Sequence, residues 1–432
     1  MTMIRSPFLL AMLCALGLAA QQPSEVVLSA TSGAKVVVGV APVPVTGLEG
    51  VPVDQDFTAV LRKDLDDSGV FGVLKERLPA SPDVKAWGQA GAEWLVLAKA
   101  GRAVNGTFSL ALQVMDTRAE KPVFSKNYSA AAESFRAPAS MLRRTAHLVA
   151  DDLVKQLTGE RGVASTRIVF VRQVSQGVKE LFQIDRDGAN ALQLTQHGSL
   201  SLAPTVTPDG RLAYVTYKGG TPEIWGQRKA NGPHERLFPI TKQEGLCFSP
   251  AWSPDGRRLA FVLGDRRGNA DIMVLDLDTN RVRRLTDGAG INTSPSWNPT
   301  GTQIAFTSDR EGGPQIYLMQ DDGSNLRRLT TEGTYNESPA WSPSGAMIAY
   351  VSRFEGKFDL FVYKLGEGKA YQITTGVSSS ESPAWSPDER SLVFTSNRFG
   401  SMQLFTTDLS GRSLQRLSEL GLCQSPKWTR SR

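Results

Sequence analysis

Hydrophobic and polar positions in the second part of the chain follow one pattern that returns six times. A polar loop leads into the phrase Pro-x-Trp (Pro-x-Val in the first copy), a turn such as Pro-Asp-Gly follows, and short apolar runs come next, separated by turns rich in Gly, Asp and Ser. Successive copies are 43 to 46 residues apart. This period predicts a β-propeller with one four-stranded blade per copy. The first prolines of the copies are Pro204, Pro250, Pro295, Pro339, Pro383 and Pro426.

The two ends of the repeat region indicate how the ring closes. The region opens with three strand-like runs of one blade, at 168–171, 181–184 and 192–195, and it ends with a single innermost strand at 426–428. We therefore expect the C-terminal strand to complete the first blade, so that residues 166–432 form a closed six-bladed ring. The Trp residues of the phrase are expected to pack between blades.

The residues before the propeller have a different rhythm. Strand-like runs at 35–40 and 94–98 alternate with a helical pattern that starts at Phe57 and with a long amphipathic pattern at 138–157. This alternation predicts a small α/β domain within residues 21–160. The predicted fold is thus an α/β N-terminal domain followed by an all-β six-bladed propeller that the C-terminal strand closes.

Residues 1–20 have the features of a secretory signal peptide. A single positive charge at Arg5 precedes the apolar run 8–20, which ends in small residues. The run is too short to span a membrane, and no later stretch reaches about 18 apolar residues. Leu13 before Cys14 disfavours a lipoprotein cleavage site, so we expect cleavage near Ala20.

Charge and cysteine content exclude several classes of protein. The formal net charge is +5, and the basic residues are scattered among turns without interleaved aromatic residues, so no nucleic-acid partner is expected. Cys247 and Cys423 fall at equivalent positions of blades that are not neighbours. Since a disulfide needs Cα atoms within about 7 Å, we expect both thiols to be free.

No catalytic or metal site is predicted. The chain contains no Gly-x-Ser-x-Gly elbow, Walker loop or dinucleotide fingerprint. His147, His197 and His234 are isolated from one another and from other candidate ligands. The segment 185–190 faintly resembles a calcium loop, but 321–325 occupies the same turn of another blade, which favours an ordinary turn. We expect no cofactor, and the sequence does not decide whether the channel binds calcium.

What remains is a surface at one end of the propeller. The loops before each Pro-x-Trp phrase are predicted to line one mouth of the central channel, where they form a ring of hydroxyl and amide groups with two carboxylates. Such a mouth is a common docking place because six loops converge there. The predicted mouth residues are Leu246, Ser249, Asn292, Thr293, Ser294, Asn336, Glu337, Ser338, Glu381, Ser382 and Gln424.

Several stretches carry a resemblance to a known family. They are Asp-Leu-Asp-Asp-Ser-Gly-Val-Phe at 64–71, the stretch 285–297, Ile-Ala-Phe-Thr-Ser-Asp at 304–309, and the repeated Ser-Pro-Ala-Trp-Ser-Pro. With them, essentially the whole mature chain resembles the TolB family of periplasmic proteins of the Tol–Pal envelope system.

The resemblance implies a function. In the family, the propeller mouth binds the lipoprotein Pal and the mature N-terminal segment binds TolA, in support of outer-membrane integrity and of constriction during cell division. The stretch 292–295 matches the Pal-contacting loop. Leu246, Cys247 and Phe248 replace more polar family residues. The segment at the start of the mature family proteins that binds TolA is matched here by Glu25, Val26, Val27 and Leu28. In this chain Gln21 to Ser24 precede that segment.

We therefore expect a monomeric, non-enzymatic docking protein of the periplasm that associates with the outer membrane through Pal. Two alternatives stay open at this point. One is the regulatory propeller of a secreted peptidase, whose hydrolase domain would have to lie on another chain. The other is a sensor that binds a glycan or another small molecule in the propeller channel.

Overall fold

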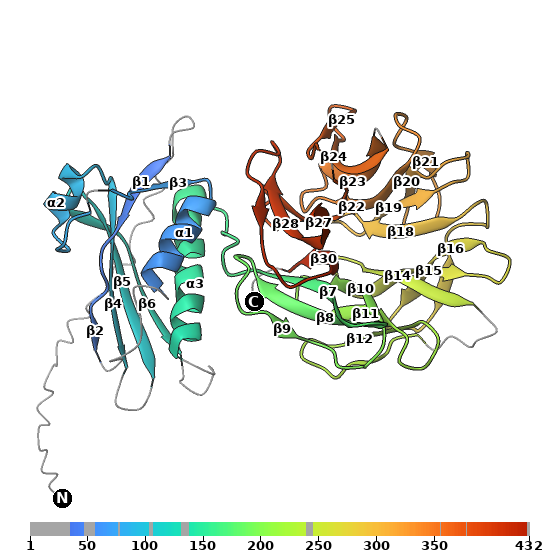
Figure 1. The fold of residues 1–432 in the computed structure, drawn as a ribbon, viewed down its shortest axis with the longest axis horizontal. Coiled ribbons are helices and arrows are strands. Elements are labelled where there is room, and N and C mark those ends of the chain that lie inside the picture. Colours follow the sequence, from blue (N-terminus) through green and yellow to red (C-terminus); the bar gives the residue numbers. More distant parts are fainter. Residues whose placement is uncertain are drawn as a thin grey trace, which may run out of the picture.

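The computed structural model describes residues 35–46, 57–76, 78–102, 107–130, 138–238, 245–354, 356–376 and 378–429. An α/β domain precedes a six-bladed propeller, as predicted (Figure 1). The predicted signal peptide 1–20 and the predicted TolA-binding residues 25–28 lie outside the described residues. Within the described ranges, no helix is both long enough and apolar enough to cross a bilayer.

The N-terminal domain is built on one mixed sheet with the strand order β3-β1-β4-β5-β6, and β2 pairs with the end of β4. Strand β1 is parallel to β3 and β4, whereas β4, β5 and β6 are antiparallel. The elements are β1 Val36–Val40, β2 Val45–Thr46, α1 Ala59–Asp67, β3 Phe71–Val73, α2 Val84–Gln89, β4 Trp94–Arg102, β5 Phe108–Asp116, β6 Lys121–Ala130 and α3 Pro138–Thr158.

Helices α1 and α3 cover one face of this sheet, on the side of the propeller, and α2 lies on the other face (Figure 1). Buried and exposed residues alternate strictly along the first part of β5, which places Leu110 and Leu112 in the core beneath Leu142 and Leu153 of α3. The sequence pattern predicted both long helical segments. It did not predict α2, a six-residue helix that begins where the Asp83 carboxylate accepts a hydrogen bond from the backbone N–H of Ala86.

Each blade is a four-stranded antiparallel sheet whose first strand lies innermost. We number the blades from the one that contains both ends of the propeller. Blade 1 is β30-β7-β8-β9 and blades 2 to 6 follow in chain order. The strands of blades 1 to 3 are β7 Arg167–Ser175, β8 Val178–Asp185, β9 Leu192–Gln193, β10 Ser201–Val206, β11 Leu212–Thr216, β12 Glu223–Gly226, β13 Glu235–Arg236, β14 Leu246–Trp252, β15 Arg258–Gly264, β16 Ala270–Asp276 and β17 Val282–Arg284.

The remaining strands repeat the same order. They are β18 Asn292–Trp297, β19 Gln303–Ser308, β20 Gln315–Gln320, β21 Arg327–Arg328, β22 Asn336–Trp341, β23 Met347–Phe354, β24 Lys357–Lys364, β25 Lys369–Gln372, β26 Ser380–Trp385, β27 Ser391–Phe399, β28 Ser401–Asp408, β29 Gln415–Arg416 and β30 Cys423–Trp428.

The C-terminal strand closes the ring, as predicted. Strand β30 pairs antiparallel with β7, with Trp428 opposite Ile168. The indole N–H of Trp428 donates to the hydroxyl of Thr166 at 2.7 Å, which ties the last strand to the start of the propeller. The six innermost strands contact one another in the closed order β10, β14, β18, β22, β26, β30 and back to β10.

The repeated Trp residues pack between blades. Trp252, Trp297 and Trp385 are each 6 to 7% exposed. Two of them also reach the preceding blade through the indole N–H: Trp297 donates to the carbonyl of Ala251 at 3.1 Å, and Trp385 donates to that of Ala340 at 2.9 Å. These contacts confirm a structural role for the phrase that defines the repeat.

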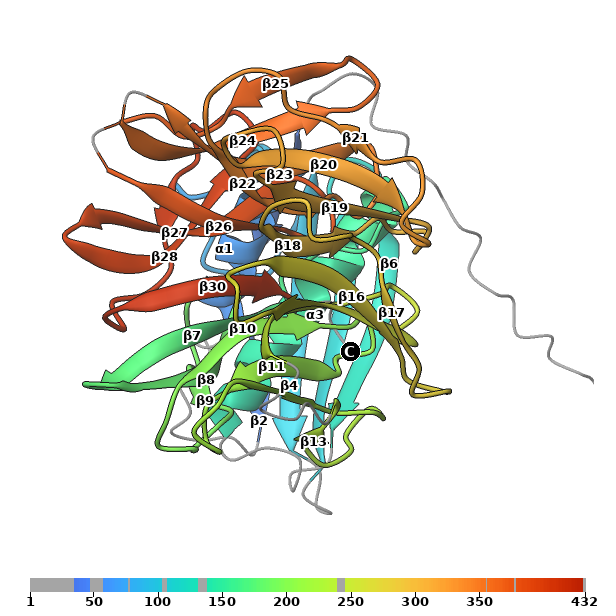
Figure 2. The same ribbon diagram turned by 90° about the vertical axis from the view of Figure 1, so that its right-hand side faces the viewer.

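The N-terminal domain meets the propeller at blades 1 and 6. Arg390, in the turn between the first and second strands of blade 6, donates to the carbonyl of Ser68 at 3.4 Å, and Arg186, in the turn after β8, pairs with Asp67 at 3.5 Å. In an antiparallel blade both turns lie at the same end. The starts of the innermost strands lie at the other end, so the predicted mouth faces away from this contact. Figure 2 shows the propeller with the N-terminal domain behind it.

Candidate functional site

The predicted mouth residues lie mostly in strands rather than in loops. The segments expected to be loops are the first halves of the innermost strands β14, β18, β22, β26 and β30, which begin three to four residues before the repeated proline. Hydrogen bonding to the second strand of each blade extends to Leu246, Asn292, Asn336, Ser380 and Cys423. The mouth is therefore held by sheet pairing.

A β-bulge recurs at the same place in all six innermost strands. Between Thr293 and Ser296, for example, the strand advances by three residues while its partner advances by two. The residue before the proline has a positive φ in every blade, between 45° and 56°. The proline follows where the bulge interrupts the ladder, so its missing N–H leaves no pairing unmade. The positive-φ residues are Ala203, Ser249, Ser294, Ser338, Ser382 and Ser425.

Because a left-handed conformation is unfavourable for residues other than Gly, this backbone arrangement needs support from its surroundings. One such contact links neighbouring blades: the backbone N–H of Ser338 donates to the Thr307 hydroxyl at 3.1 Å. Bulges re-aim the side chains on either side of them, and they are frequent next to functional sites.

We define the mouth ring as the residue just before the bulge in each blade. All six members are partly exposed, and four of them are among the predicted mouth residues. Leu202 and Phe248 are not among those predictions, although alignment of the repeats places them at the same position as Thr293. The mouth ring consists of Leu202, Phe248, Thr293, Glu337, Glu381 and Gln424.

Asn292 and Asn336 do not line the mouth, contrary to the sequence-based expectation. Both side chains are completely buried. The amide nitrogen of Asn292 donates to Asp271 in the preceding blade at 3.3 Å, and its amide oxygen accepts a bond from Arg310 at 2.8 Å. Asn336 donates to Gln315 of its preceding blade at 2.7 Å. These residues hold adjacent blades together.

This inter-blade contact has a repeated form, which we call the polar lock. A carboxylate or amide on the third strand accepts a bond from a Thr hydroxyl of the same blade and faces the first residue of the next innermost strand. In blade 3 the Thr286 hydroxyl donates to Asp271 at 2.5 Å, and in blade 4 the Thr330 hydroxyl donates to Gln315 at 2.7 Å.

Two blade junctions depart from the polar lock, and both contain a cysteine. Cys247 is buried in an apolar cluster with Leu237 and Phe261. Cys423 is buried at the junction of blades 6 and 1, where the amide oxygen of Gln403 and the hydroxyl of Ser418 have no hydrogen-bond partner within the described part of the chain. Burial raises the pKa of the Cys423 thiol to about 12. As predicted, Cys247 and Cys423 do not form a disulfide.

Charged groups give the mouth a mixed polarity. Burial and the nearby Glu337 carboxylate raise the pKa of Glu381 above its usual range. Arg310 lies over the rings of Phe306 and Tyr317 at the end of the second strand of blade 4. Arg398 lies over two rings at the matching place in blade 6. The mouth thus combines carboxylates with guanidinium groups that aromatic rings hold in place.

Large apolar side chains are exposed at the same end of the strands. Leu246 and Ile291 lie at the starts of innermost strands of blades 3 and 4, and Val174 and Phe399 lie at the hairpins of blades 1 and 6. Their exposed fractions are 46%, 48%, 50% and 62%. Apolar and aromatic residues next to polar groups are typical of protein–protein interfaces.

The expectation that the three histidines are isolated is wrong. His147 is buried, with Nδ1 at 2.6 Å from a carboxylate oxygen of Asp64. His197 and His234 flank the ring of Tyr214. The Asp64 partner of His147 lies 83 residues away in the chain, so no local sequence pattern could have identified this pair.

One of these histidines lies near a serine and a carboxylate. His197 Nδ1 is 3.2 Å from the Ser201 hydroxyl, which donates to Glu180 at 3.2 Å. Ser201 is completely buried, and the carboxylate bonds the serine instead of orienting the imidazole. This arrangement joins blades 1 and 2 and lacks the geometry that activates a serine nucleophile.

The turn that faintly resembles a calcium loop uses its acidic side chains within the protein. Asp185 accepts a bond from the side chain of Asn190 at 2.7 Å, and Asp187 pairs with Arg143 of α3. The segment 185–190 thus connects the propeller to the N-terminal domain.

Comparison with known proteins agrees with the fold and extends it. Residues 154–429 match the model of the TolB beta propeller domain, and residues 25–123 match that of the TolB amino-terminal domain. A crystal structure of TolB from Acinetobacter baumannii superimposes with a TM-score of 0.76 at 26% identity, over 92% of this chain and 97% of that one.

Curated relatives are similar over shorter stretches. The chain is 36% identical over 289 residues to the Tol-Pal system protein TolB of Anaeromyxobacter sp. (strain K), which is 64% of this chain and 63% of the relative. It is 32% identical over 236 residues to the protein TolB homolog of Chlorobaculum tepidum, or 54% of this chain and 52% of the relative. The matches thus span between half and two thirds of these relatives. Since the propeller family model alone covers more than half of the chain, the chain belongs to the TolB family.

Proposed function

We propose that this protein is a periplasmic docking component of the Tol–Pal system that binds Pal at the mouth ring and TolA through the N-terminal segment 25–28. The observation that carries the proposal is the bulged mouth. Six equivalent strand starts present partly exposed side chains, and exposed apolar residues surround them. Family membership supplies the identity of the partners.

A docking role without catalysis fits the chemistry of the described side chains. The contact between Ser201 and His197 is part-buried at the junction of blades 1 and 2, and the Glu180 carboxylate bonds the serine rather than the imidazole. We propose further that the protein acts as a monomer without a cofactor and reaches the outer membrane through Pal.

Calorimetric titration of the purified protein with Pal from the same bacterium tests the docking face. Thr293→Arg introduces a long cation into the ring, and burying it without a partner costs several kcal/mol. We expect the affinity for Pal to fall by orders of magnitude, with little change in the melting temperature.

A matched control separates the position from the substitution. Thr302 is an exposed residue at the opposite end of the same blade. Thr302→Arg should bind Pal as the unmodified protein does. Undiminished binding by Thr293→Arg would place the docking face elsewhere.

The second contact needs its own variant. Deletion of residues 21–28 should abolish binding to TolA and spare binding to Pal, because the mouth ring belongs to a different domain. Equal loss of both partners would show that the segment supports the whole fold instead of providing a separate contact.

A further inference from the structure

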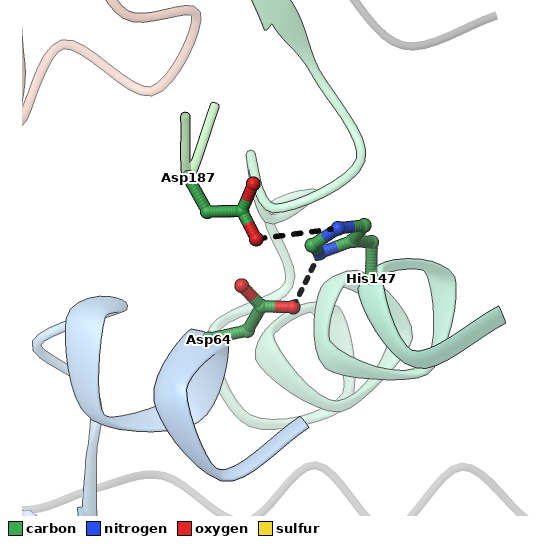
Figure 3. A group of neighbouring side chains, drawn as sticks. All are labelled: Asp64, His147 and Asp187. Atoms are coloured by element: carbon green, nitrogen blue, oxygen red, sulfur yellow. Dashed lines mark hydrogen bonds and ion pairs between the residues drawn. The ribbon is translucent and has the colours of Figure 1, made fainter. Parts of the chain in front are cut away.

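A buried group of ionisable side chains joins the two domains on the side away from the mouth. His147 belongs to α3, Asp64 to α1, and Asp187 to the turn between β8 and β9 of the propeller (Figure 3). His147 Nδ1 lies 2.6 Å from Asp64 Oδ2, and Nε2 lies 3.7 Å from Asp187 Oδ2. The three side chains are between 1 and 4% exposed.

The geometry favours a protonated imidazole over a metal ion. The two ring nitrogens face two different carboxylates, one in each domain (Figure 3). Nδ1 is hydrogen-bonded to Asp64, whereas Nε2 is within ion-pair distance of Asp187 and makes no hydrogen bond within the described part of the chain. Only the imidazolium form carries the positive charge that attracts both carboxylates, whereas a metal ion would take one ring nitrogen and need both carboxylates beside it. Arg143 already pairs with Oδ2 of Asp187, the same oxygen that faces His147.

The charges around His147 balance only when it carries a proton. Asp64 faces it from α1, Asp187 faces it from the propeller turn, and Arg143 lies one helical turn earlier on α3. Two carboxylates and one guanidinium leave a net charge of −1, which the imidazolium cancels. Beside this group, Arg186 of the same turn lies near Asp64 and pairs with Asp67, and the Asp151 carboxylate accepts bonds from Ser165 and the backbone.

We propose that the proton on His147 is a latch between the two domains. With the proton, the imidazolium lies between Asp64 of the N-terminal domain and Asp187 of the propeller and attracts both. Without it, two buried carboxylates from opposite domains face each other with only Arg143 to compensate, and an uncompensated buried charge is strongly destabilising. The contact between the domains then loosens.

Ionisation equilibria agree with this geometry. Burial acts to lower the pKa of His147, but the hydrogen bond and charge of Asp64, together with the charge of Asp187, outweigh it and raise the pKa. Burial raises the pKa of Asp64 as well, so the pair holds one proton tightly. We place that proton on the imidazole because Asp187 faces its other nitrogen.

The sign of the pH dependence follows from the raised pKa. The stabilisation is complete below the ordinary histidine value of about 6.5 and is lost as the pH rises through the higher value of the folded protein. The latch should therefore open as the pH rises through the raised pKa of His147. This inference does not depend on the docking partners proposed above.

Two measurements on the full chain test the latch. The first is an NMR titration of the three histidines, in which His197→Gln and His234→Gln identify the remaining signal as that of His147. The second is amide hydrogen exchange in the turn 186–191 between pH 6 and 9, corrected for the intrinsic pH dependence. We expect His147 to titrate above 6.5 and exchange in the turn to rise about tenfold across the same transition.

Asp187→Asn supplies the decisive variant, and blade 4 supplies its control. Asp322 is at the same position of the equivalent turn, accepts the same type of backbone bond, and is exposed far from the interface. Asp187→Asn should lower the pKa of His147 by at least about one unit and remove the pH dependence of exchange, whereas Asp322→Asn should change neither.

A measured pKa of His147 at or below about 6.5 in the unmodified protein would overturn the proposal. This test does not depend on whether any substituted protein folds. The proposal would also be overturned if amide exchange in the turn did not change with pH. The same holds if Asp322→Asn altered the pKa of His147 and the exchange as much as Asp187→Asn does.

Discussion

The side-chain amide nitrogen of Asn292 lies 3.3 Å from the carboxylate of Asp271 in the preceding blade. The next residue, Thr293, belongs to the mouth ring and is partly exposed. Consecutive residues of one strand thus serve two different purposes, because one holds the blades together and the other faces the mouth. Single substitutions can therefore separate the stability of the propeller from docking.

Asn292→Ala should destabilise the propeller. Truncation leaves the buried Asp271 and the partly exposed Arg310 without one partner each, and such a loss costs about 1 to 3 kcal/mol. Urea unfolding followed by tryptophan fluorescence measures the change. Thr293→Ala is the control and should stay within about 0.5 kcal/mol of the unmodified protein. Equal stability of Asn292→Ala and the control would mean that the polar lock contributes nothing.

Cys423→Asn should stabilise the junction of blades 6 and 1. Asn336 donates to Gln315 at the equivalent place of blade 5, so an amide at 423 can supply the missing donor to the Gln403 oxygen. One net hydrogen bond is worth about 1 kcal/mol, or about 2 to 4 °C in the melting temperature of a domain of this size class.

Cys247→Asn is the matched control, because the same substitution there buries an amide among Leu237 and Phe261 and should lower the melting temperature. Scanning calorimetry measures the melting temperatures of both variants. A lower melting temperature for both variants would show that both cysteines contribute only through their packing.

Glu381→Gln should stabilise the protein in a pH-dependent way. The raised pKa of Glu381 means that the folded state disfavours the carboxylate, so stability is lost as the pH rises through that pKa. At pH 7 the variant should gain roughly 0.5 kcal/mol, and near pH 4 the gain should vanish. Thermal melts across this range measure it, with the exposed Glu160→Gln as control. A gain that is the same at pH 4 and pH 7 would contradict the assignment.

Removal of residues 424–432 should open the ring. The deletion removes the pairing of β30 with β7 and the partly buried Trp428 side chain, and loss of a large aromatic side chain costs up to about 3 to 5 kcal/mol. We expect aggregation or a much lower melting temperature, measured by light scattering and calorimetry. Deletion of 430–432 alone leaves β30 intact and should be neutral. A stable, Pal-binding 424–432 deletion would show that the ring closes in another way.

The propeller and its closure could be predicted because each blade repeats the same local sequence pattern. Pro-x-Trp, the turn after it and the apolar runs recur at a fixed period, so the strand count follows from the chain alone. The helix α2 escaped prediction because six residues with a glycine at position 88 carry too little periodicity.

The mouth could be predicted only in part. The repeats located the strand starts, but the bulge decides which side chain faces the mouth and which faces the neighbouring blade. Asn292 and Thr293 are equally polar in sequence, and only the partner Asp271, 21 residues away, distinguishes them. His147 illustrates the same limit, since Asp64 lies 83 residues before it and Asp187 belongs to the other domain.

Because the last strand closes the ring, the propeller cannot be completed before the end of the chain has been synthesised. Thr166 and Trp428, which the closed ring brings to 2.7 Å, are 262 residues apart in the chain. At synthesis rates of about 5 to 20 residues per second, roughly 13 to 50 s pass between their appearance. Through this interval the first blade has only three of its strands, and its open inner edge can pair with another chain. A chain that ends before β30 keeps this open edge, which makes it prone to aggregation.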